Sequence, residues 1–376
     1  MKEEREKAFS LMENIIKLFL KRREVVKEIG RIKKELGLPI EDIKRELEIR
    51  EKLLSKGIPI EDEMVGKLFN FLILDALMQQ GWRMEKEKYA EEGLIDLSLH
   101  LPFVENPYGI LKLASQESSD LPKMLSSRLG FKVEEILISY TRETAIFAIL
   151  KSLLGGRFVC IPKPSNPIYY RLAWSANCRP IWIDNGEPLK YLIVGFPHDP
   201  TGEVPNLKSL NDLECIIIDG TYYDFTEERI TDLAENTIFI YGLSTPFGLP
   251  FPTLIIGEKA KEVKRVHEIL FGKTDILSPL VLAMLRSKGF WSLNDIRVLR
   301  KKVVSELRDA SIKLVSKEGL FLLFYDEKKR NVYELALKAG VKVISGEDLG
   351  LPQYYFALNP ASKDLENGIK RIKDVL

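Results

Sequence analysis

The chain has 376 residues, of which 56 are lysine or arginine and 55 are aspartate or glutamate, so its formal net charge is only +1. This balance provides no general attraction to nucleic acid or to an anionic membrane, so any anionic ligand must be bound by a local group of charges. The length predicts two or three domains with at least one large apolar core.

The N-terminal segment predicts a protein of the cytoplasm. Its first ten residues, MKEEREKAFS, carry charges of both signs and lack the apolar core of a signal peptide. The most apolar early run, FNFLILDALM at 69–78, is about half a bilayer span and contains Asp75. We therefore expect neither export nor a helix that crosses a membrane.

Three helices are predicted at about 2–36, 40–55 and 61–83, because charged and apolar residues recur there at helical spacing. Gly37 and Pro39 end the first helix. With a rise of 1.5 Å per residue this helix is about 50 Å long, which two shorter helices of the same chain cannot cover. Its apolar face therefore needs a partner, most simply a second copy of the chain.

Three cations interrupt the apolar seam of the first helix. Steps of three and four along it give Arg5, Ala8, Met12, Ile15, Phe19, Arg22, Val26, Ile29, Lys33 and Leu36. A buried cation without a partner costs several kcal/mol, so these side chains either reach water or face an acidic ligand. Arg22 and Lys33 are about 16 Å apart along the axis and can reach both ends of one small molecule. Arg5 is about 25 Å from Arg22, so it can serve only a site in a partner subunit.

Polar residues also mark the second and third helices. Asp42, Arg45 and Glu46 share one face of the second helix, either as an internally paired surface cluster or as part of a pocket. Gln79 interrupts the apolar seam of the third helix, either as a satisfied core amide or as a pocket residue. Cations, carboxylates and an amide, without a nucleophile, a histidine or metal-ligand spacing, suit a small polyanion that must be shaped rather than attacked.

Over residues 3–82 the sequence resembles the all-helical AroQ-type chorismate mutases. The resemblance follows an ungapped spacing through Arg5, Arg22, Arg23, Lys33, Asp42, Arg45, Glu46 and Gln79. It implies a three-helix domain in an intertwined homodimer, or a higher homo-oligomer, that converts chorismate to prephenate by a Claisen rearrangement. No acid, base, metal or cofactor is required. Glu46 would take the ring hydroxyl of the substrate, and Asp42 would bind or orient near it.

The same resemblance implies roles for the remaining residues. Arg22 and Arg5 of the partner subunit would bind the two carboxylates of chorismate, with Arg45 helping to frame the site. Lys33 and Gln79 would donate hydrogen bonds to the ether oxygen. These bonds strengthen as negative charge develops there, which is the differential binding that catalysis requires.

The sequence changes character near residue 90, so we place two domains at 1–88 and 89–376. In the second, continuous apolar runs separated by longer segments predict an α/β domain with a mostly parallel sheet covered on both faces. The runs are EILISY (135–140), RFVCIP (157–162), PIWIDN (180–185), YLIVGFP (191–197), CIIID (215–219), TIFIYG (237–242) and TLIIG (253–257). Cys160, Cys178 and Cys215 lack CxxC spacing and a nearby histidine, so we interpret them as buried, reduced thiols.

This second region resembles the fold-type I aminotransferases, which use pyridoxal phosphate. Its landmarks are NPYG (106–109), DPTG (199–202), IIDGTYYDF (217–225) and LSTPFGLP (243–250). The resemblance implies that Asp219 stands where the family pairs a carboxylate with the pyridine nitrogen, and Tyr222 where a tyrosine meets the ring hydroxyl. The lysine that forms the Schiff base is replaced by Thr245, which cannot form an internal aldimine.

Other family positions have changed as well. Gly242 replaces a phosphate-binding serine, Asp199 replaces an asparagine, and the arginine that clamps the substrate carboxylate falls near Ala357. We therefore expect no transamination and no cofactor at the vestigial positions Asp219, Tyr222 and Thr245. Such a domain is either a regulatory module whose former cleft binds an aromatic amino acid or prephenate, or an architectural part that adds a dimer interface.

Two alternatives to a mutase remain open. An isochorismate pyruvate-lyase would use similar cations on a related substrate. A non-enzymatic regulator would bind metabolites or partner enzymes of aromatic biosynthesis with both domains. The intact set of pocket residues argues against the second alternative, because a domain freed from catalysis would lose them.

Overall fold

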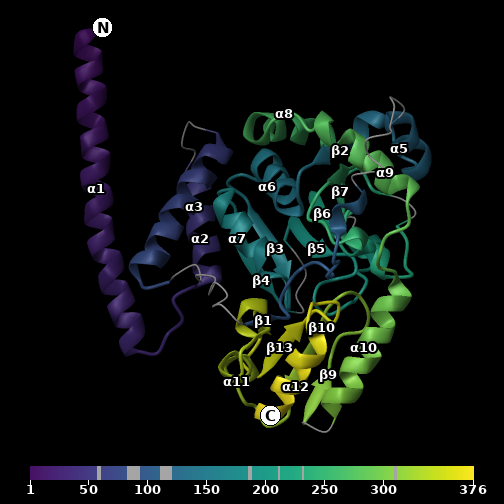
Figure 1. Cartoon of the computed structure of the whole chain (residues 1–376). Coiled ribbons are helices and arrows are strands. Elements are labelled where there is room, and N and C mark those ends of the chain that lie inside the picture. The colour runs from purple at the N-terminus through teal and green to yellow at the C-terminus, as the bar shows by residue number, and fades with distance from the viewer. Residues whose placement is uncertain are drawn as a thin grey trace. The chain divides into compact units, whose positions relative to one another are not determined.

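The computed structural model describes residues 1–56, 61–82, 94–110, 121–184, 189–210, 212–230, 233–308 and 311–376. The chain divides into two compact units. The first comprises residues 1–87 together with the short segment 155–157, and the second comprises the remainder. The helices of the first unit are the purple part of Figure 1.

The first unit consists of α1 (Lys2–Glu35), α2 (Ile43–Leu54) and α3 (Asp62–Gln79), as predicted. Gly37 follows α1 with a φ of 65°, the left-handed conformation that commonly ends a helix. Asp42 begins α2 as its N-cap, because its side chain accepts a hydrogen bond from the backbone N of Arg45 at 3.0 Å.

The second half of α1 packs on α3, and the two helices run in the same direction. The rings of Phe19 and Phe71 stack with their centroids 5.7 Å apart. One turn further along both helices, Arg23 forms an ion pair with Asp75 at 2.5 Å. Each contact advances four residues on both helices, which is possible only for a parallel pair.

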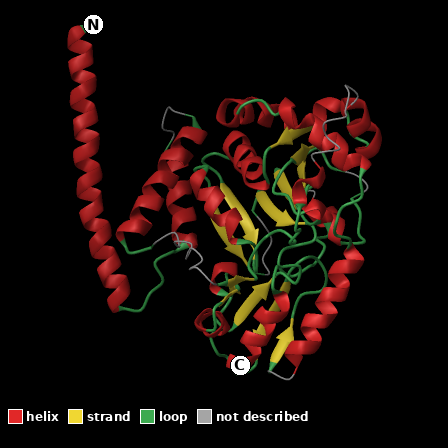
Figure 2. Ribbon diagram, in the orientation of Figure 1, coloured by secondary structure: helices red, strands yellow, loops and turns green. Residues whose placement is uncertain are grey.

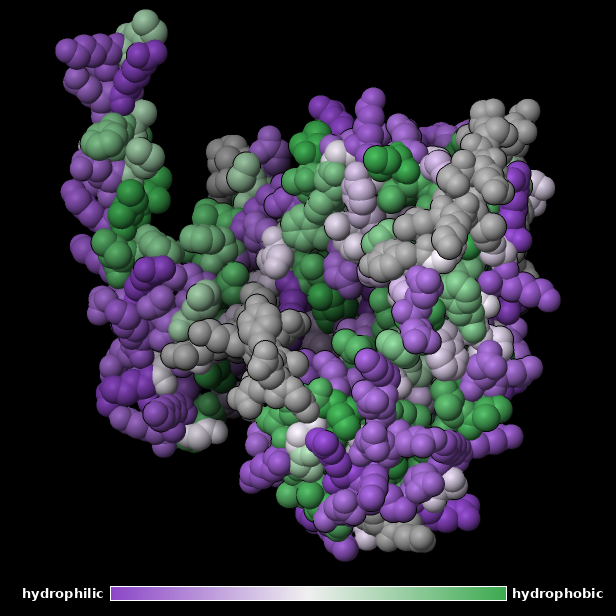
Figure 3. Space-filling view, viewed as in Figure 1, coloured by the Kyte–Doolittle hydropathy of each residue, from purple (hydrophilic) through white to green (hydrophobic). Residues whose placement is uncertain are grey.

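The first half of α1 is left uncovered in the described part of its own unit. Phe9, Leu11, Met12, Ile15, Ile16 and Leu18 are between 53% and 66% exposed. Val26 alone is buried among the residues of this helix. In Figures 1 and 3 this half extends beyond α2 and α3 and carries green, apolar side chains on its surface. The prediction that the two shorter helices cannot cover α1 is confirmed.

All seven predicted apolar runs form one sheet, and its mostly parallel character is confirmed (Figure 2). Its order is β2-β8-β7-β6-β5-β3-β4, and β8 alone runs antiparallel to its neighbours. The strands are β2 (Ile136–Ser139), β3 (Phe158–Pro162), β4 (Arg179–Ile183), β5 (Tyr191–Gly195), β6 (Cys215–Gly220), β7 (Thr237–Tyr241) and β8 (Thr253–Ile256).

Helices cover both faces of this sheet. One face packs on α6 (Arg142–Leu153), α7 (Pro167–Ser175) and α8 (Ala260–Phe271), and the other on α5 (Leu121–Leu129) and α9 (Ser278–Arg286). Along β6, Cys215 and Ile217 belong to the first core and Ile216 and Ile218 to the second. Successive strand residues point to opposite faces, so a strand buried on both sides must be continuously apolar. The three cysteines are buried and free, as predicted.

The C-terminal part contains a second, smaller sheet that the sequence analysis missed. Four antiparallel strands follow the order β12-β13-β10-β9, and β1 pairs in parallel with β11. The strands are β1 (Ile95–Asp96), β9 (Ile312–Leu314), β10 (Leu322–Asp326), β11 (Val341–Lys342), β12 (Ile344–Ser345) and β13 (Tyr355–Leu358). The helices of this part are α10 (Leu293–Leu307), α11 (Val332–Lys338) and α12 (Leu365–Val375). None of the described helices has the length and apolarity needed to cross a membrane.

Candidate functional site

Arg22 of α1 lies beside a buried carboxylate that the sequence analysis did not assign to the site. Its Nη1 is 3.9 Å from Oδ2 of Asp75 in α3, and neither atom has a hydrogen bond in the described chain. Arg23 holds the other carboxylate oxygen, with its Nε at 2.9 Å and its Nη2 at 2.5 Å from Oδ1. Asp75 is only 7% exposed. Burial lowers the pKa of Arg22, although the charge of Asp75 acts in the opposite direction.

Lys33 and Gln79 belong to adjacent turns of the contact between α1 and α3. A Cβ added at Gly30 would lie 2.9 Å from Cγ of Gln80, so the end of α3 packs closely on α1 one turn before Lys33. Lys33 is partly buried, and its Nζ donates a hydrogen bond to the carbonyl of Ile40 at 2.6 Å. Gln79 is also partly buried. The structure therefore brings these two predicted donors to the same region of the helical unit.

The candidate residues of α2 differ in their surroundings. Glu46 is buried, which suits a site residue. Arg45 is exposed and forms an ion pair with Glu48 at 3.1 Å. The side chain of Asp42 caps α2, so within one chain it has a structural role. Arg5 is exposed in the uncovered half of α1, about 25 Å along the axis from Arg22.

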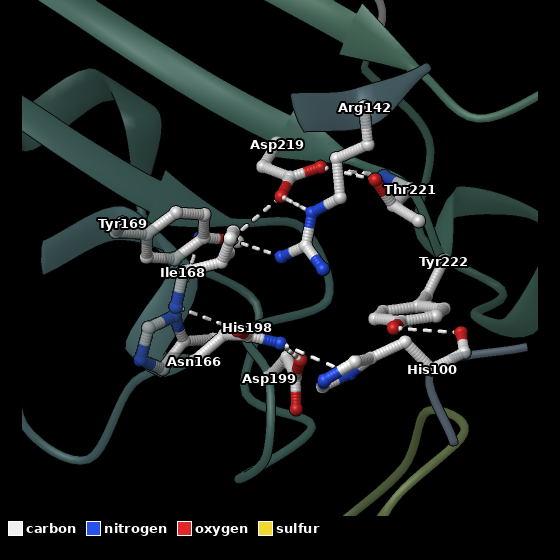
Figure 4. Close-up of polar contacts among 11 residues, drawn as sticks. His100, Arg142, Asn166, Ile168, Tyr169, His198, Asp199, Asp219, Thr221 and Tyr222 are labelled. Atoms are coloured by element: carbon white, nitrogen blue, oxygen red, sulfur yellow. Dashed lines mark hydrogen bonds and ion pairs between the residues drawn. The ribbon is translucent and has the colours of Figure 1, made fainter. Parts of the chain in front are cut away.

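The larger unit contains a second polar cluster around Asp219 at the end of β6. Its Oδ2 accepts hydrogen bonds from Nε of Arg142 at 2.6 Å and from the hydroxyl of Tyr169 at 2.8 Å. Its Oδ1 accepts from the backbone N of Thr221 at 3.0 Å and from the hydroxyl of that residue at 2.5 Å. Figure 4 shows Arg142 and Tyr169 converging on this carboxylate from α6 and α7. Both oxygens of Asp219 are therefore occupied by groups of the same chain.

The ion pair of Arg142 and Asp219 is fully inside the protein, with exposed fractions of 6% and 2%. Burial acts to lower the pKa of Arg142, but Asp219, together with Tyr169, Tyr222 and Asp199, raises the pKa overall. Arg142 therefore remains a cation. Sequence analysis missed Arg142. A signal was present, because this arginine directly follows the N-cap Thr141 at the start of a helix that comes after a buried strand.

The other vestigial positions lie around the same cluster. The hydroxyl of Tyr222 donates to the backbone carbonyl of His100 at 3.0 Å. Asp199 accepts a hydrogen bond from the side chain of Asn166 at 2.8 Å. Burial raises the pKa of Asp199 to about 6, although Arg142 and the hydrogen bond from Asn166 act in the opposite direction. Thr245 is buried at the start of a short 3-10 helix, Thr245–Phe247.

A cavity of about 340 Å³ adjoins this cluster. Its polar lining includes Arg142, Glu143, Thr221, Tyr222, Ser244 and Thr245, and its apolar lining includes Leu99, Pro102, Phe103, Val104, Leu249 and Pro250. In the described parts of the chain, histidine, cysteine, aspartate and glutamate side chains do not gather in groups of three or more that could hold a metal ion.

Residues 5–81 match the family model of chorismate mutase type II. The match spans the three helices of the first unit and includes all the candidate residues from Arg5 to Gln79. The match supports chorismate mutase activity for this segment, and chorismate mutases are isomerases.

The larger unit has the fold of aminotransferases. Aspartate aminotransferase from Thermus thermophilus with maleate is 18% identical with a TM-score of 0.66, over 76% of this chain and 92% of that chain. The aromatic aminotransferase from Pyrococcus horikoshii OT3 is 19% identical with a TM-score of 0.64, over 77% of this chain and 97% of that chain. At such identities the likeness shows the fold alone.

One curated protein also matches by sequence. The histidinol-phosphate aminotransferase of Clostridium novyi (strain NT) is 26% identical over 185 residues, which are 45% of this chain and 52% of the relative. The chain thus spans about half the length of this relative.

Proposed function

We propose that this protein is a chorismate mutase that converts chorismate to prephenate by a cofactor-independent Claisen rearrangement in aromatic amino-acid biosynthesis. One observation carries the proposal. The family match from 5 to 81 contains an unbroken set of cations, carboxylates and an amide at the spacing of the enzyme family.

The reaction is unimolecular, so the residues need only hold the reactive conformer and stabilise the charge that develops on the ether oxygen. Arg22, with Arg5 of the partner subunit, binds the two carboxylates of the substrate. Its Nη1 makes no hydrogen bond in the described chain, so it has a donor to offer. Lys33 and Gln79 donate to the ether oxygen, and these bonds are strongest in the transition state.

The proposal includes a homodimer or a higher homo-oligomer. The exposed apolar stripe of α1 supports this, since water contact of six large apolar side chains on one helix half is unfavourable. A second copy that covers the stripe also brings its own Arg5 within reach of Arg22. The site is therefore complete only in the assembly.

We also propose that the larger domain is not catalytic and has a structural or regulatory role. Pyridoxal phosphate, which the fold family implies, does not fit the residues present. The family uses a carboxylate to receive the pyridine nitrogen, but both oxygens of Asp219 are occupied by Arg142, Tyr169 and Thr221. Thr245 cannot supply the amine of a Schiff base.

The decisive experiment is incubation of the purified full-length protein with chorismate in the absence of any cofactor. We expect chorismate to disappear and its product to yield phenylpyruvate on treatment with acid. Release of pyruvate from isochorismate, with no reaction of chorismate, would select an isochorismate pyruvate-lyase. No reaction with either compound would select a non-enzymatic metabolite-binding regulator.

A further inference from the structure

Asp75 contacts two neighbouring arginines of α1 in different ways. Its Oδ1 accepts hydrogen bonds from Nε and Nη2 of Arg23, at 2.9 Å and 2.5 Å, whereas its Oδ2 lies 3.9 Å from Nη1 of Arg22. The second distance is too long for a hydrogen bond. Oδ2 and this Nη1 are both buried, and neither has a hydrogen-bond partner among the described residues. The carboxylate is therefore shared unequally, and Arg22 keeps a donor that Asp75 could have taken.

Arg23 is held at Asp75 by more than its hydrogen bonds. Its Cζ lies 4.7 Å from the centroid of the Phe19 ring, which is a cation–π contact. That ring stacks in turn on Phe71 of α3, one helical turn before Asp75. Two donors on one oxygen and an aromatic contact leave the guanidinium of Arg23 little freedom to leave Oδ1.

The burial of Asp75 shows what this arrangement prevents. The side chain is only 7% exposed, and a buried carboxylate needs a cation. If Arg23 did not satisfy it, Arg22 is a second guanidinium within reach, and a guanidinium binds a carboxylate best through two parallel hydrogen bonds. Nη1 of Arg22 would then be bonded within the protein, as Nε of Arg142 is bonded to Asp219 in the larger unit.

We propose that Arg23 is a positioning residue of the mutase site. By satisfying the buried carboxylate of Asp75, it keeps Nη1 of Arg22 available for a carboxylate of the substrate. Arg23 itself touches no substrate in this arrangement and acts only through Asp75 and Arg22. The inference rests on the proposed function, because it needs Arg22 to bind chorismate.

The effect should appear mainly in KM. The charge of a substrate carboxylate does not change during the rearrangement, so a contact with it stabilises the ground state and the transition state alike. Losing such a contact raises KM and leaves kcat nearly unchanged. We expect Arg23→Met, which keeps an apolar contact with Phe19, to raise KM for chorismate about tenfold and to lower kcat less than about threefold. Arg23→Lys keeps the charge but not the two-point contact with Oδ1, so it should raise KM about threefold.

A second substitution separates positioning from the loss of an ion pair. When Asp75→Asn is added to Arg23→Met, the amide has no negative charge with which to capture Arg22. The KM of the double variant should therefore return to within about threefold of the wild-type value. An ion pair that only stabilises the fold predicts no such recovery. Lys27→Met is the matched control, since it removes a cation one turn further along α1 that pairs with Glu24 on the exposed surface.

Steady-state kinetics of the full-length variants test the inference, with circular dichroism to check their helices. Calorimetric titration with prephenate should rank the affinities of the variants in the same order without turnover. An active wild-type protein whose KM is unchanged in both Arg23→Met and Arg23→Lys overturns the inference alone, as does a folded double variant no better than Arg23→Met. A wild-type protein that neither converts chorismate nor binds prephenate overturns the proposed function, and the inference with it.

Discussion

In the helical unit Arg22 and Asp75 approach to 3.9 Å without a hydrogen bond between their facing atoms, whereas in the larger unit Arg142 and Asp219 are joined at 2.6 Å. Both pairs link a helix to another element through a buried carboxylate, but Arg142 is buried and Arg22 is partly exposed. In the open pair, Nη1 of Arg22 and Oδ2 of Asp75 have no hydrogen-bond partner in the described chain, and we propose that this Arg22 donor serves the substrate. In the closed pair the carboxylate of Asp219 is bound by groups of the same chain, which supports the proposal that it stabilises the fold and holds no cofactor.

The largest expected effect concerns the proposed site in the helical unit. We predict that Lys33→Ala lowers kcat/KM for chorismate by roughly 10²–10³-fold, because a donor aimed at developing charge is removed from a preorganised site. Steady-state rates on the purified variant measure the loss, with circular dichroism to check its helices. Arg31→Ala is the matched control, since among the described residues Arg31 pairs only with Glu28 and Glu35 on the exposed face of α1. Near-normal turnover in Lys33→Ala would reject its assignment.

The next effect concerns the closed pair. Arg142→Ala should lower the free energy of unfolding of the larger unit by about 3–5 kcal/mol, because it leaves the carboxylate of Asp219 buried without its cation. Chemical denaturation measures this change. Arg297→Ala removes a more exposed arginine that pairs with Glu227 and Glu318, and it should cost no more than about 1 kcal/mol. Equal losses in the two variants would contradict the comparison.

The uncovered half of α1 gives a third test. Ile15→Glu places a charge in the apolar stripe and should raise the dissociation constant of the homodimer roughly tenfold or more. Mutase activity should fall in parallel at low protein concentration, since the proposed site takes Arg5 from the partner subunit. Sedimentation at several concentrations follows the assembly. Lys17→Glu, on an exposed polar position of the same helix half, is the control and should leave assembly intact.

The smallest effect is a pH dependence in the larger unit. Burial raises the pKa of Asp199 from its ordinary 3.8 to about 6, so between these values the folded state binds more protons than the unfolded chain. The free energy of unfolding therefore falls as the pH rises through this window. Asp199→Asn should remove this contribution and stabilise the protein near pH 7 by about 1–3 kcal/mol. Chemical denaturation at about pH 4, 5, 6 and 7 measures the free energy of unfolding of both proteins across this window. An unchanged slope would show that another group titrates there.

The sheet of the larger unit was predictable because each strand is a continuous apolar run with cores on both sides. The smaller sheet was not, because β11 and β12 have two residues each and their pairing is set by distant segments, such as Leu322 opposite Leu358. The spacing of residues along the first helix likewise allowed Arg22 and Lys33 to be predicted as cations on its apolar seam. The pairing of Arg142 with Asp219 joins residues 77 positions apart and depends on how α6 meets β6, which no local pattern encodes. Asp75 was visible as a carboxylate in an apolar run, but its partner became clear only from the packing of α1 on α3.

The single continuous α1 has a further consequence. Most helical stability in proteins comes from packing of an apolar face, and the large apolar side chains of α1 before Phe19 are exposed within the described parts of the chain. The backbone amides of this half of α1 should therefore exchange with solvent much faster in dilute than in concentrated protein. If two chains associate as proposed, the turns that carry Arg5 would be stabilised by the contact, and the concentration of the protein would then set how much of the proposed mutase site is complete.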